Sequence, residues 1–413
     1  MTPPIIILRL MANFLDDGQL DAIERLRTGS ILCGGVGSGK SRTALAYYYK
    51  QQGGSIDPFI PMDQMTAKDL YIITTARKRD TLEWEKETAP FLLNKEDAMN
   101  RYYICNYYVD SWTNIKKYKD VKDAFFIFDE QRVVGYGVWT KAFLKIAKHN
   151  DWILLSATPG DTWMDYLPVF LANGFYENKT DFIMQHVIQK SYVSYFQVDY
   201  YINISKLRAL KEKILINIDY QSPAHENYKD VITEYDKDKY RFVCRKRWNI
   251  FEERPIETAS EFCSVLRKIT NTDHSRINAV LSTYKEHPKI IIFYNFDYEL
   301  DLLKQTFDKE GIIYREWNGH KHESLPEDES WVYLVQYAAG SEGWNCTKTD
   351  SIIFYSMNYS YKQMVQAAGR INRRNTPYKE LYFYVMKTKA PIDNSIALAL
   401  KNKKDFNIKK FAG

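Results

Sequence analysis

Long hydrophobic runs are missing from this sequence of 413 residues. No uninterrupted apolar segment approaches the roughly 20 residues that a membrane-spanning helix needs, so an integral membrane protein is not expected. The N-terminal run Ile5 to Leu8 is broken by Arg9, with no positive residue before it and no small-residue cleavage site after it. A signal peptide is therefore not expected either, and the run is interpreted as a buried strand or helix.

Cysteine is scarce as well, with five residues, and no two of them form a C-x-x-C pair. This scattered, odd-numbered set favours a reducing compartment and argues against a disulfide framework or a structural zinc site. The segment His320 to Glu323 is better explained as a polar loop than as a cluster of metal ligands. We therefore expect a cytoplasmic protein, in the host cytoplasm if a virus encodes it.

The remaining composition is that of ordinary globular domains. Hydrophobic residues make up 45% and charged residues 26% of the chain, and the length predicts two or three domains. The net charge of +5 is unevenly spread, since residues 351–413 carry 12 basic and only 3 acidic side chains. This basic end suits a polyanionic partner, although a solvated surface has the same signature.

Short apolar runs alternating with helical patterns predict an α/β fold with parallel sheets. Strand-like runs of the first half are 32–34, 70–75, 124–128 and 152–155, and those of the second half are 290–294, 312–314, 331–335, 352–355 and 381–385. Between about 161 and 285 the pattern is mostly polar and helical. We expect one domain over 1–205 and a second over 206–413 that opens with a helical segment to about 285.

A glycine-rich motif of the phosphate-binding type follows the first strand-like run and precedes a helical stretch over 40–50. It fits G-x-x-x-x-G-K-[ST] in the strand-to-helix context that supports the motif. Its backbone N–H groups would surround phosphate oxygens, its lysine would neutralise the β- and γ-phosphates, and its last serine would ligate Mg²⁺. The motif predicts ATP and Mg²⁺ as ligands of Gly34, Gly35, Val36, Gly37, Ser38, Gly39, Lys40 and Ser41.

Two acidic residues follow the apolar run Phe125 to Phe128. Asp129 would hold Mg²⁺, directly or through water, and Glu130 would orient or deprotonate the attacking water. Such a strand end is equally typical of a solvated loop when it stands alone. Combined with the preceding phosphate-binding motif, it indicates a catalytic role.

These blocks and two others in the same order resemble the superfamily 2 helicases and translocases. Asp129-Glu130-Gln131-Arg132 corresponds to the acidic box of that family, although its last two residues are not the commonest ones. Residues 156–159, Ser-Ala-Thr-Pro, look like motif III, and residues 366–373 look like motif VI, Q-x-x-G-R-x-x-R. The resemblance implies two RecA-like domains that hold Mg·ATP between them and drive movement on nucleic acid.

The resemblance also implies roles for single residues. Arg373 would be the arginine finger that stabilises charge on the transferred phosphoryl group, and Arg370 its phosphate-binding companion. A spacing of three on a helix would put both on one face, with Gln366 facing the same cleft. A solvated basic helix is the alternative. Gln19 resembles the glutamine that reads adenine in this superfamily, with a surface glutamine as the alternative.

Candidate nucleic-acid contacts rest on less specific resemblances. Hydroxyl, amide and glycine N–H groups suit phosphate contacts that do not read the base sequence. Trp84 and Trp112 could stack on bases, with burial in a core as the alternative. The candidates are Thr75 and Arg77 in motif Ia, Ser111 and Trp112 in a second backbone-contacting motif, Asn295 in motif IV and Ser341 in motif V. Gly343, also in motif V, is expected to contact the nucleotide.

Three segments are similar to the Snf/Swi-type remodelling ATPases within this superfamily, namely 163–170, 180–182 and 266–271. Glu342-Gly343-Trp344-Asn345 departs from their usual motif V, and the compact chain resembles small helicases of bacterial viruses and prophages. The implied function is that of an ATP-dependent DNA helicase or translocase. Single-stranded, duplex or branched DNA would be its partner, together with unidentified replication or recombination proteins.

Three other functions remain open from the sequence. An RNA helicase would share all of these motifs, since only the Snf/Swi resemblance favours DNA. A P-loop kinase or other phosphotransferase would need no second domain carrying Q-x-x-G-R-x-x-R. An ATP-gated DNA clamp that does not hydrolyse ATP would need no water-activating acid such as Glu130.

Overall fold

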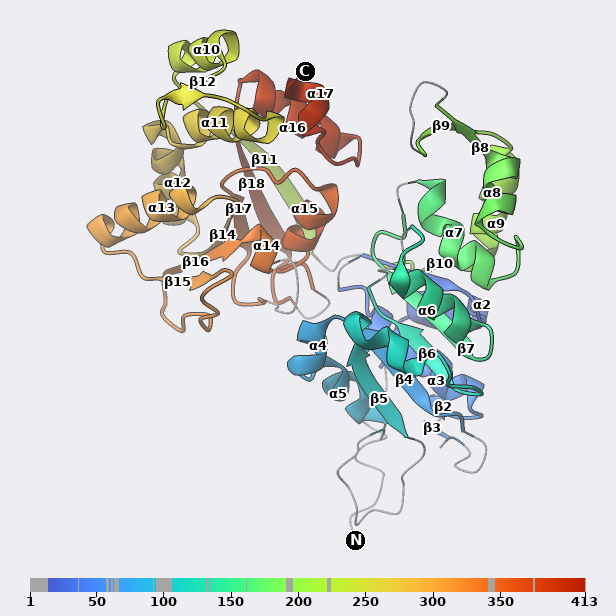
Figure 1. The fold of residues 1–413 in the computed structure, drawn as a ribbon. Coiled ribbons are helices and arrows are strands. Elements are labelled where there is room, and N and C mark those ends of the chain that lie inside the picture. Colours follow the sequence, from blue (N-terminus) through green and yellow to red (C-terminus); the bar gives the residue numbers. More distant parts are fainter. Residues whose placement is uncertain are drawn as a thin grey trace. The chain divides into compact units, whose positions relative to one another are not determined.

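The computed structural model of this chain divides into two compact units, Met1–Gln221 and Ser222–Gly413, and each is described by itself (Figure 1). Both units have the predicted α/β fold, each with a six-stranded parallel sheet. The structure describes residues 14–35, 37–56, 59–60, 62, 67–91, 93, 106–130, 133, 135–160, 162–190, 196–220, 224–340, 346–373 and 376–412.

Unit 1 is built on a sheet with the strand order β10-β1-β7-β6-β4-β5. All neighbouring strands in it run parallel, so their carboxyl ends meet at one edge. Along that edge, the strand before the glycine-rich motif and the strand before the acidic pair are separated only by β7. The strands are β1 (Ile31–Cys33), β4 (Leu70–Thr74), β5 (Tyr107–Ser111), β6 (Phe125–Phe128), β7 (Asp151–Ser156) and β10 (Leu215–Asn217).

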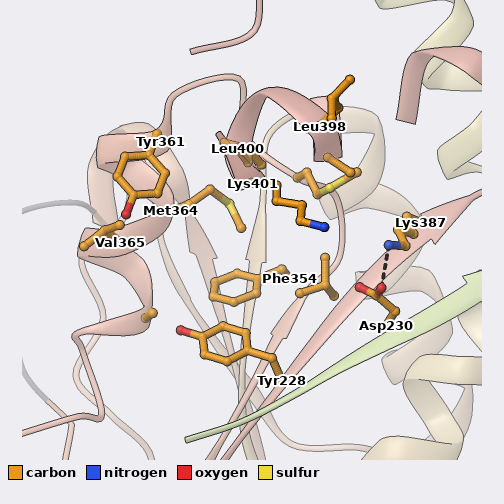
Figure 2. Close-up of a pocket in the computed structure, with 14 residues that line it drawn as sticks. Tyr228, Asp230, Phe354, Tyr361, Met364, Val365, Lys387, Leu398, Leu400 and Lys401 are labelled. Carbon is orange, nitrogen blue, oxygen red and sulfur yellow. Dashed lines mark hydrogen bonds and ion pairs between the residues drawn. The ribbon is translucent and has the colours of Figure 1, made fainter. Parts of the chain in front are cut away.

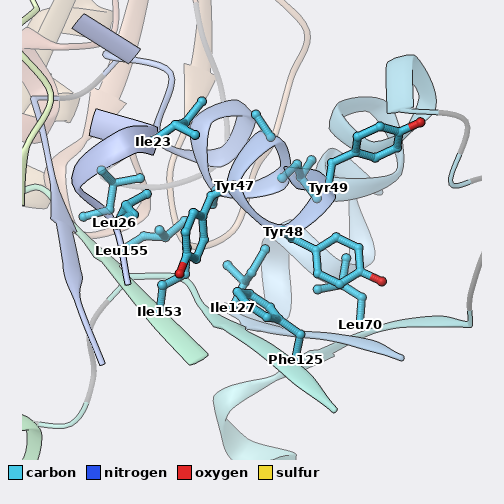
Figure 3. Packing of buried hydrophobic residues seen from close by; sticks show 14 of the residues in the cluster. Ile23, Leu26, Tyr47, Tyr48, Tyr49, Leu70, Phe125, Ile127, Ile153 and Leu155 are labelled. Atoms are coloured by element: carbon cyan, nitrogen blue, oxygen red, sulfur yellow. The ribbon is translucent and has the colours of Figure 1, made fainter. Parts of the chain in front are cut away.

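Two apolar clusters cover the two faces of this sheet, as a parallel sheet requires. On one face α3 packs its tyrosines onto the strands, and the ring centroids of Tyr48 and Phe125 lie 5.2 Å apart (Figure 3). On the other face Phe143 of α6 meets Trp152 edge-on at 4.9 Å. The strands of this sheet are therefore buried on both faces.

Further helices and short strands complete unit 1. The helices are α2 (Asp17–Arg25), α3 (Lys40–Gln51), α4 (Ala76–Asp80), α5 (Glu83–Thr88), α6 (Val138–Ala147), α7 (Trp163–Ala172), α8 (Lys179–His186), α9 (Ile204–Ile214) and the 3-10 helices η1 (Ala89–Phe91) and η2 (Trp112–Tyr118). Two antiparallel pairs join β2 (Ser55–Ile56) to β3 (Phe59–Ile60) and β8 (Val187–Gln189) to β9 (Val198–Tyr201).

Unit 2 has a second parallel sheet with the order β11-β18-β17-β14-β16-β15. Its strands are β11 (His225–Thr233), β14 (Lys289–Tyr294), β15 (Tyr314–Trp317), β16 (Trp331–Gln336), β17 (Ser351–Phe354) and β18 (Glu380–Thr388), with a small antiparallel pair of β12 (Trp248–Asn249) and β13 (Arg254–Pro255). Its helices are α10 (Lys237–Lys246), α11 (Ala259–Asn271), α12 (His274–Glu286), α13 (Asp297–Glu310), α14 (Tyr337–Gly340), α15 (Tyr361–Ala368), α16 (Pro391–Lys401) and α17 (Ile408–Ala412).

The division between the units lies between Gln221 and Ser222, later than the expected division between 205 and 206. α9 and β10 belong to unit 1 because β10 pairs with β1, with Leu215 opposite Ile31. The region from 161 to 285 is largely helical, as expected, but it also supplies this strand and β11, the edge strand of the second sheet. Most of β11 is exposed, so its sequence shows neither an apolar run nor a regular alternation.

Within the described part of the chain, no helix is long and apolar enough to cross a membrane. The four cysteines in that part, Cys33, Cys244, Cys263 and Cys346, are free thiols. The same residues contain no group of three or more His, Cys, Asp or Glu side chains that could hold a metal ion.

Candidate nucleotide site

The glycine-rich loop connects β1 to α3 at the carboxyl edge of the first sheet. Gly37 and Gly39 have φ angles of +85° and +79°, in the left-handed region that favours glycine. At Gly34 a Cβ atom would lie 2.4 Å from Oγ of Ser38, so any side chain there would distort the loop. These glycines permit the tight turn that ends at the N-terminus of α3, where backbone N–H groups favour anions.

Lys40 reaches back over this loop. Its Nζ donates hydrogen bonds to the carbonyl oxygens of Gly34 at 2.7 Å and Gly35 at 2.8 Å. Ser41 follows in the first turn of α3 and is half-buried. Val36, which the motif also includes, lies outside the described residues. The loop, the ammonium group and the hydroxyl therefore occur together, in the order that a phosphate-binding loop requires.

The segment resembling motif III adjoins the same loop. β7 lies between β1 and β6, and Ser156 at its end is in register with Cys33. The backbone N–H of Gly34 donates to the carbonyl oxygen of Ser156 at 3.3 Å, and Oγ of Ser156 accepts from the N–H of Thr158 at 3.1 Å. This backbone contact connects the two motifs directly.

Asp129 is buried at the end of β6, and three donors converge on its Oδ2. They are Oγ1 of Thr74 at 2.7 Å, Nζ of Lys78 at 2.9 Å and Nε1 of Trp84 at 3.2 Å. Burial alone would raise the pKa of the Asp129 carboxyl, but the charge of Lys78 and these hydrogen bonds outweigh it and lower the pKa. Asp129 is therefore an ionised carboxylate at neutral pH, the form that binds Mg²⁺.

Glu130 adopts a backbone conformation that is unusual for a residue with a side chain. Its φ angle is +54°, in the left-handed region, which costs about 1–2 kcal/mol for a residue other than glycine. Its Oε1 lies 3.0 Å from Nζ of Lys78. Six other described residues that are not glycine share this conformation, so the catalytic role of Glu130 stays a prediction. Gln131 and Arg132 of the acidic box lie outside the described residues.

Lys78 was not among the predicted site residues, yet its mostly buried ammonium bridges both acids. Burial would lower the pKa of this lysine, but the two carboxylates raise it, so Lys78 remains charged. The sequence contains one signal for it, because Lys78 directly follows the motif Ia candidates Thr75 and Arg77. The pairing itself depends on β4 lying beside β6 in the sheet.

Gln19 is only 2% exposed, so its interpretation as a surface glutamine is wrong. Its Nε2 donates to the carbonyl oxygen of Gly39 at 3.3 Å and to Oγ1 of Thr43 at 3.1 Å. Its Oε1 accepts from the N–H of Asp16 and completes a capping box at the start of α2. Gln19 thus contacts the helix that follows the P-loop, and its role at adenine stays a prediction.

Two tryptophans considered for base stacking are part of the core of unit 1. Trp84 and Trp112 are 1% and 2% exposed, and both donate their indole N–H to Asp129, Trp84 to Oδ2 and Trp112 to the backbone oxygen at 2.8 Å. Neither ring offers a face to a base, so the stacking prediction is wrong and the alternative of core burial is confirmed. Both rings instead support the acidic strand end.

The other candidate nucleic-acid contacts of unit 1 differ in their exposure. Thr75 is buried and caps α4, accepting from the N–H of Lys78 at 3.3 Å. Ser111 is buried as well, and its Oγ lies 2.6 Å from Oγ1 of Thr113. Arg77 is half-buried. Of these three candidates, Arg77 has the most exposed side chain.

In unit 2, Asn295 at the end of β14 connects two strand ends. Its Nδ2 donates to Oγ of Ser356 at 2.8 Å, and its Oδ1 accepts from Nδ2 of Asn358 at 2.7 Å. The amide expected at nucleic acid is therefore used within the unit. Ser341 and Gly343 of motif V lie outside the described residues.

The two arginines of motif VI do not share a helix, which corrects the prediction from their spacing. α15 ends at Ala368, because the N–H of Arg370 bonds to the carbonyl oxygen of Ala367 in a tighter turn. Arg370 is 5% exposed, whereas Arg373 is half-buried and lies in the segment beyond the turn. Gln366 remains on α15 and is half-buried.

A cavity of about 770 Å³ lies beside α15, against the face that carries Tyr361, Met364, Val365 and Ala368 (Figure 2). Its walls come from α15, α16 and the strands β11, β17 and β18, and an ion pair between Asp230 and Lys387 lies at one end. The described lining contains no residue of the candidate site. It consists of Tyr228, Asp230, Phe354, Met357, Tyr361, Met364, Val365, Ala368, Val385, Lys387, Ala397, Leu398, Leu400 and Lys401.

Together, the loop, the ionised acid and the parallel sheet give unit 1 the features of a P-loop nucleotide-binding domain. Residues 274–375, in unit 2, match the protein family described as the helicase conserved C-terminal domain. That match spans α12 to the end of motif VI, including the described motif IV and motif VI candidates.

Two curated proteins are similar to part of the chain. The chromatin remodeling factor mit1 of Schizosaccharomyces pombe is 26% identical over 118 residues, which cover 26% of this chain and 8% of that protein. Protein CHROMATIN REMODELING 19 of Arabidopsis thaliana is 27% identical over 131 residues, covering 30% of this chain and 17% of that protein. The chain thus corresponds to a small part of each relative.

Among solved structures, the chain is similar to the Sulfolobus solfataricus SWI2/SNF2 ATPase core in complex with dsDNA. The sequence identity is 14% and the TM-score 0.41, with 96% of this chain and 92% of that chain covered.

Proposed function

We propose that this protein is a nucleic-acid-stimulated ATPase of the Snf2-like helicase type, which couples ATP hydrolysis to movement on DNA. The observation that carries the proposal is the convergence of Lys40, the ionised Asp129 and Glu130 at one edge of a parallel sheet. The helicase C-terminal domain matched by residues 274–375 supports a motor rather than a small-molecule kinase.

The residues present suit Mg·ATP. The P-loop and Lys40 would hold the phosphates, while Ser41 and Asp129 would hold the cation, which neutralises charge that develops on the phosphoryl group. Glu130 would accept a proton from the attacking water. Arg373 would stabilise the same developing charge, Arg370 would bind phosphate, and Gln19 would read the adenine.

Duplex or branched DNA is the proposed track. Two partial relatives are named as chromatin remodelling proteins, and unit 2 ends in a strongly basic segment. A positive surface favours phosphate contacts that are independent of base sequence. An RNA helicase is the second candidate, because the ATP-site motifs do not distinguish the two nucleic acids.

The test is an ATPase assay with single-stranded, duplex and four-way DNA and with RNA, compared side by side. We expect duplex and branched DNA to stimulate hydrolysis most. Glu130→Gln should retain ATP binding and lose turnover, and Lys40→Ala should lose both. Hydrolysis that no nucleic acid stimulates would contradict the motor, and stimulation by RNA alone would select the second candidate.

A further inference from the structure

We propose that Lys78 is a positioning residue that holds the acidic pair away from Mg·ATP until nucleic acid binds along α4. The inference rests on the proposed function. It assigns to one side chain the coupling between nucleic-acid binding and Mg·ATP binding. Nζ of Lys78 lies 2.9 Å from Oδ2 of Asp129 and 3.0 Å from Oε1 of Glu130.

In this arrangement the ammonium group of Lys78 forms ion pairs with both carboxylates that the proposed hydrolysis needs. Oδ2 of Asp129 already accepts from Thr74 and Trp84 as well, so its lone pairs are engaged by protein donors. Oε1 of Glu130 faces the same ammonium group. A fixed positive charge about 3 Å away also repels a divalent cation, and the repulsion is strong where water is largely excluded.

The helix that carries Lys78 adjoins two of the segments that are candidates for nucleic-acid contact. α4 begins after the buried cap Thr75, and Arg77 on its first turn is half-buried. Arg79 forms an ion pair with Asp110 at 3.2 Å, next to Ser111 at the end of β5. A shift of either segment on binding a phosphate backbone therefore moves α4 and, with it, Lys78.

The chain offers a matched control on the same sheet. Lys68 also bridges two carboxylates, with its Nζ 2.9 Å from Asp123 and 2.9 Å from Asp151, at the opposite edge of the sheet. Substitution of Lys68 removes a double ion pair of similar distances between more exposed groups, and it leaves the acidic pair untouched. Any effect specific to Lys78 is therefore separable from a general loss of ion pairing in unit 1.

The experiment compares the full-length wild type with Lys78→Gln, Lys78→Arg and Lys68→Gln. Binding of a fluorescent, non-hydrolysable ATP analogue is titrated with Mg²⁺ in the absence of nucleic acid, and turnover is measured with and without duplex DNA. For Lys78→Gln we expect half-saturating Mg²⁺ to fall and basal turnover to rise, each by about tenfold, which is a typical size for coupling between two sites.

Stimulation by DNA should shrink by the same factor in Lys78→Gln, while Lys78→Arg and Lys68→Gln should behave like the wild type. Unchanged Mg²⁺ dependence and an unchanged stimulation ratio in Lys78→Gln would overturn the proposal, as would equal effects of Lys68→Gln. A variant that binds Mg²⁺ and nucleotide but cannot turn over with DNA would overturn it too, since Lys78 would then be required for hydrolysis.

Melting temperatures of all variants identify any unfolded one, and Lys78→Met then replaces Lys78→Gln. The Mg²⁺ titration needs no nucleic acid, so it tests Lys78 even if the wild type proves not to be stimulated by DNA. Failure of the motor proposal and failure of this inference are therefore distinguishable.

Discussion

Arg370 and Arg373 have different surroundings, although motif VI separates them by only three residues. Arg370 is buried in the turn after α15, and its backbone oxygen accepts from the N–H of Cys346. Arg373 is less buried and lies past that turn. The finger role of Arg373 and the phosphate-binding role of Arg370 stay predictions.

We predict that Arg373→Ala lowers turnover by about 10³-fold or more, while nucleotide affinity changes little, because a finger acts on charge that develops during hydrolysis. Single-turnover hydrolysis and binding of a fluorescent ATP analogue measure the two effects. Arg315→Ala, which removes an exposed arginine of the same unit, is the control. Lost binding with unchanged turnover at saturation would reverse the assigned role.

His186 makes the stability of unit 1 depend on pH. It is fully buried, with Nε2 2.7 Å from the hydroxyl of Tyr176 and Nδ1 3.1 Å from the carbonyl oxygen of Ile202. Burial lowers the pKa of this histidine in the folded state, and the charge of Lys206 adds to the effect. Between the lowered pKa of the folded state and the unfolded-state value of about 6.5, the unfolded chain therefore binds a proton that the folded chain does not.

We predict that the free energy of unfolding falls as pH drops below about 6.5, by about 1.4 kcal/mol per pH unit at most from this site. Stability from neutral His186 is fully present above that pH and is lost on acidification. Denaturant unfolding of the wild type and of His186→Gln between pH 7.5 and 5.5 measures it. Equal slopes for both proteins would assign the pH dependence to other groups.

At the level of elements, β10 decides where unit 1 ends. It pairs with β1, the strand that leads into the P-loop, and buries Ile216 against the cluster that contains α3. Without it, β1 would become an edge strand with unpaired backbone groups. β10 is only three residues long. Its place beside β1 in the sheet gives it this role, because three residues are too few for a distinct strand pattern in the sequence.

We predict that a fragment ending at residue 221 melts cooperatively and binds ATP, whereas one ending at 205 is unstable and aggregates. The shorter fragment lacks β10 and nearly all of α9. The edge of β1 is then exposed, and the core loses the apolar side chains of Leu207 and Ile214. Thermal melting and light scattering of the two fragments provide the test. A stable, nucleotide-binding 1–205 fragment would show that the earlier division is sufficient.

For the whole molecule, the two units account for the described chain, and no third compact unit is present in it. Separation of a long duplex costs about 1.4 kcal/mol per base-pair step and requires the strands to be held apart. At a four-way junction, pairs broken on one side re-form on another. Movement at a junction is nearly neutral in energy and needs only directional force.

We therefore predict faster and more complete strand release from a forked or four-way substrate than from a long duplex with a single-stranded tail, at equal ATP. Gel-based strand-release assays with the two substrates at matched length provide the comparison, with Lys40→Ala as the inactive control. Preferential release from the tailed duplex would instead indicate a conventional helicase.

The motifs and most strands could be predicted because their signals are local. The P-loop needs glycines and a lysine at fixed spacing, and buried parallel strands such as Ile290 to Tyr294 are continuous apolar runs. Aligned carboxyl ends then bring the loop, motif III and the acidic pair to one edge of the sheet. The sequence alone therefore predicts which residues of unit 1 form the candidate nucleotide site.

Tertiary structure alone decided the contacts that join segments distant in the chain. Lys78 meets Asp129 because β4 pairs with β6, and the burial of Trp84 and Trp112 follows from the packing around that strand end. β11 is polar and mostly exposed, yet it completes a sheet through backbone hydrogen bonds that any sequence can form. Such pairings depend on which strands become neighbours, and residue types along a single segment do not encode that choice.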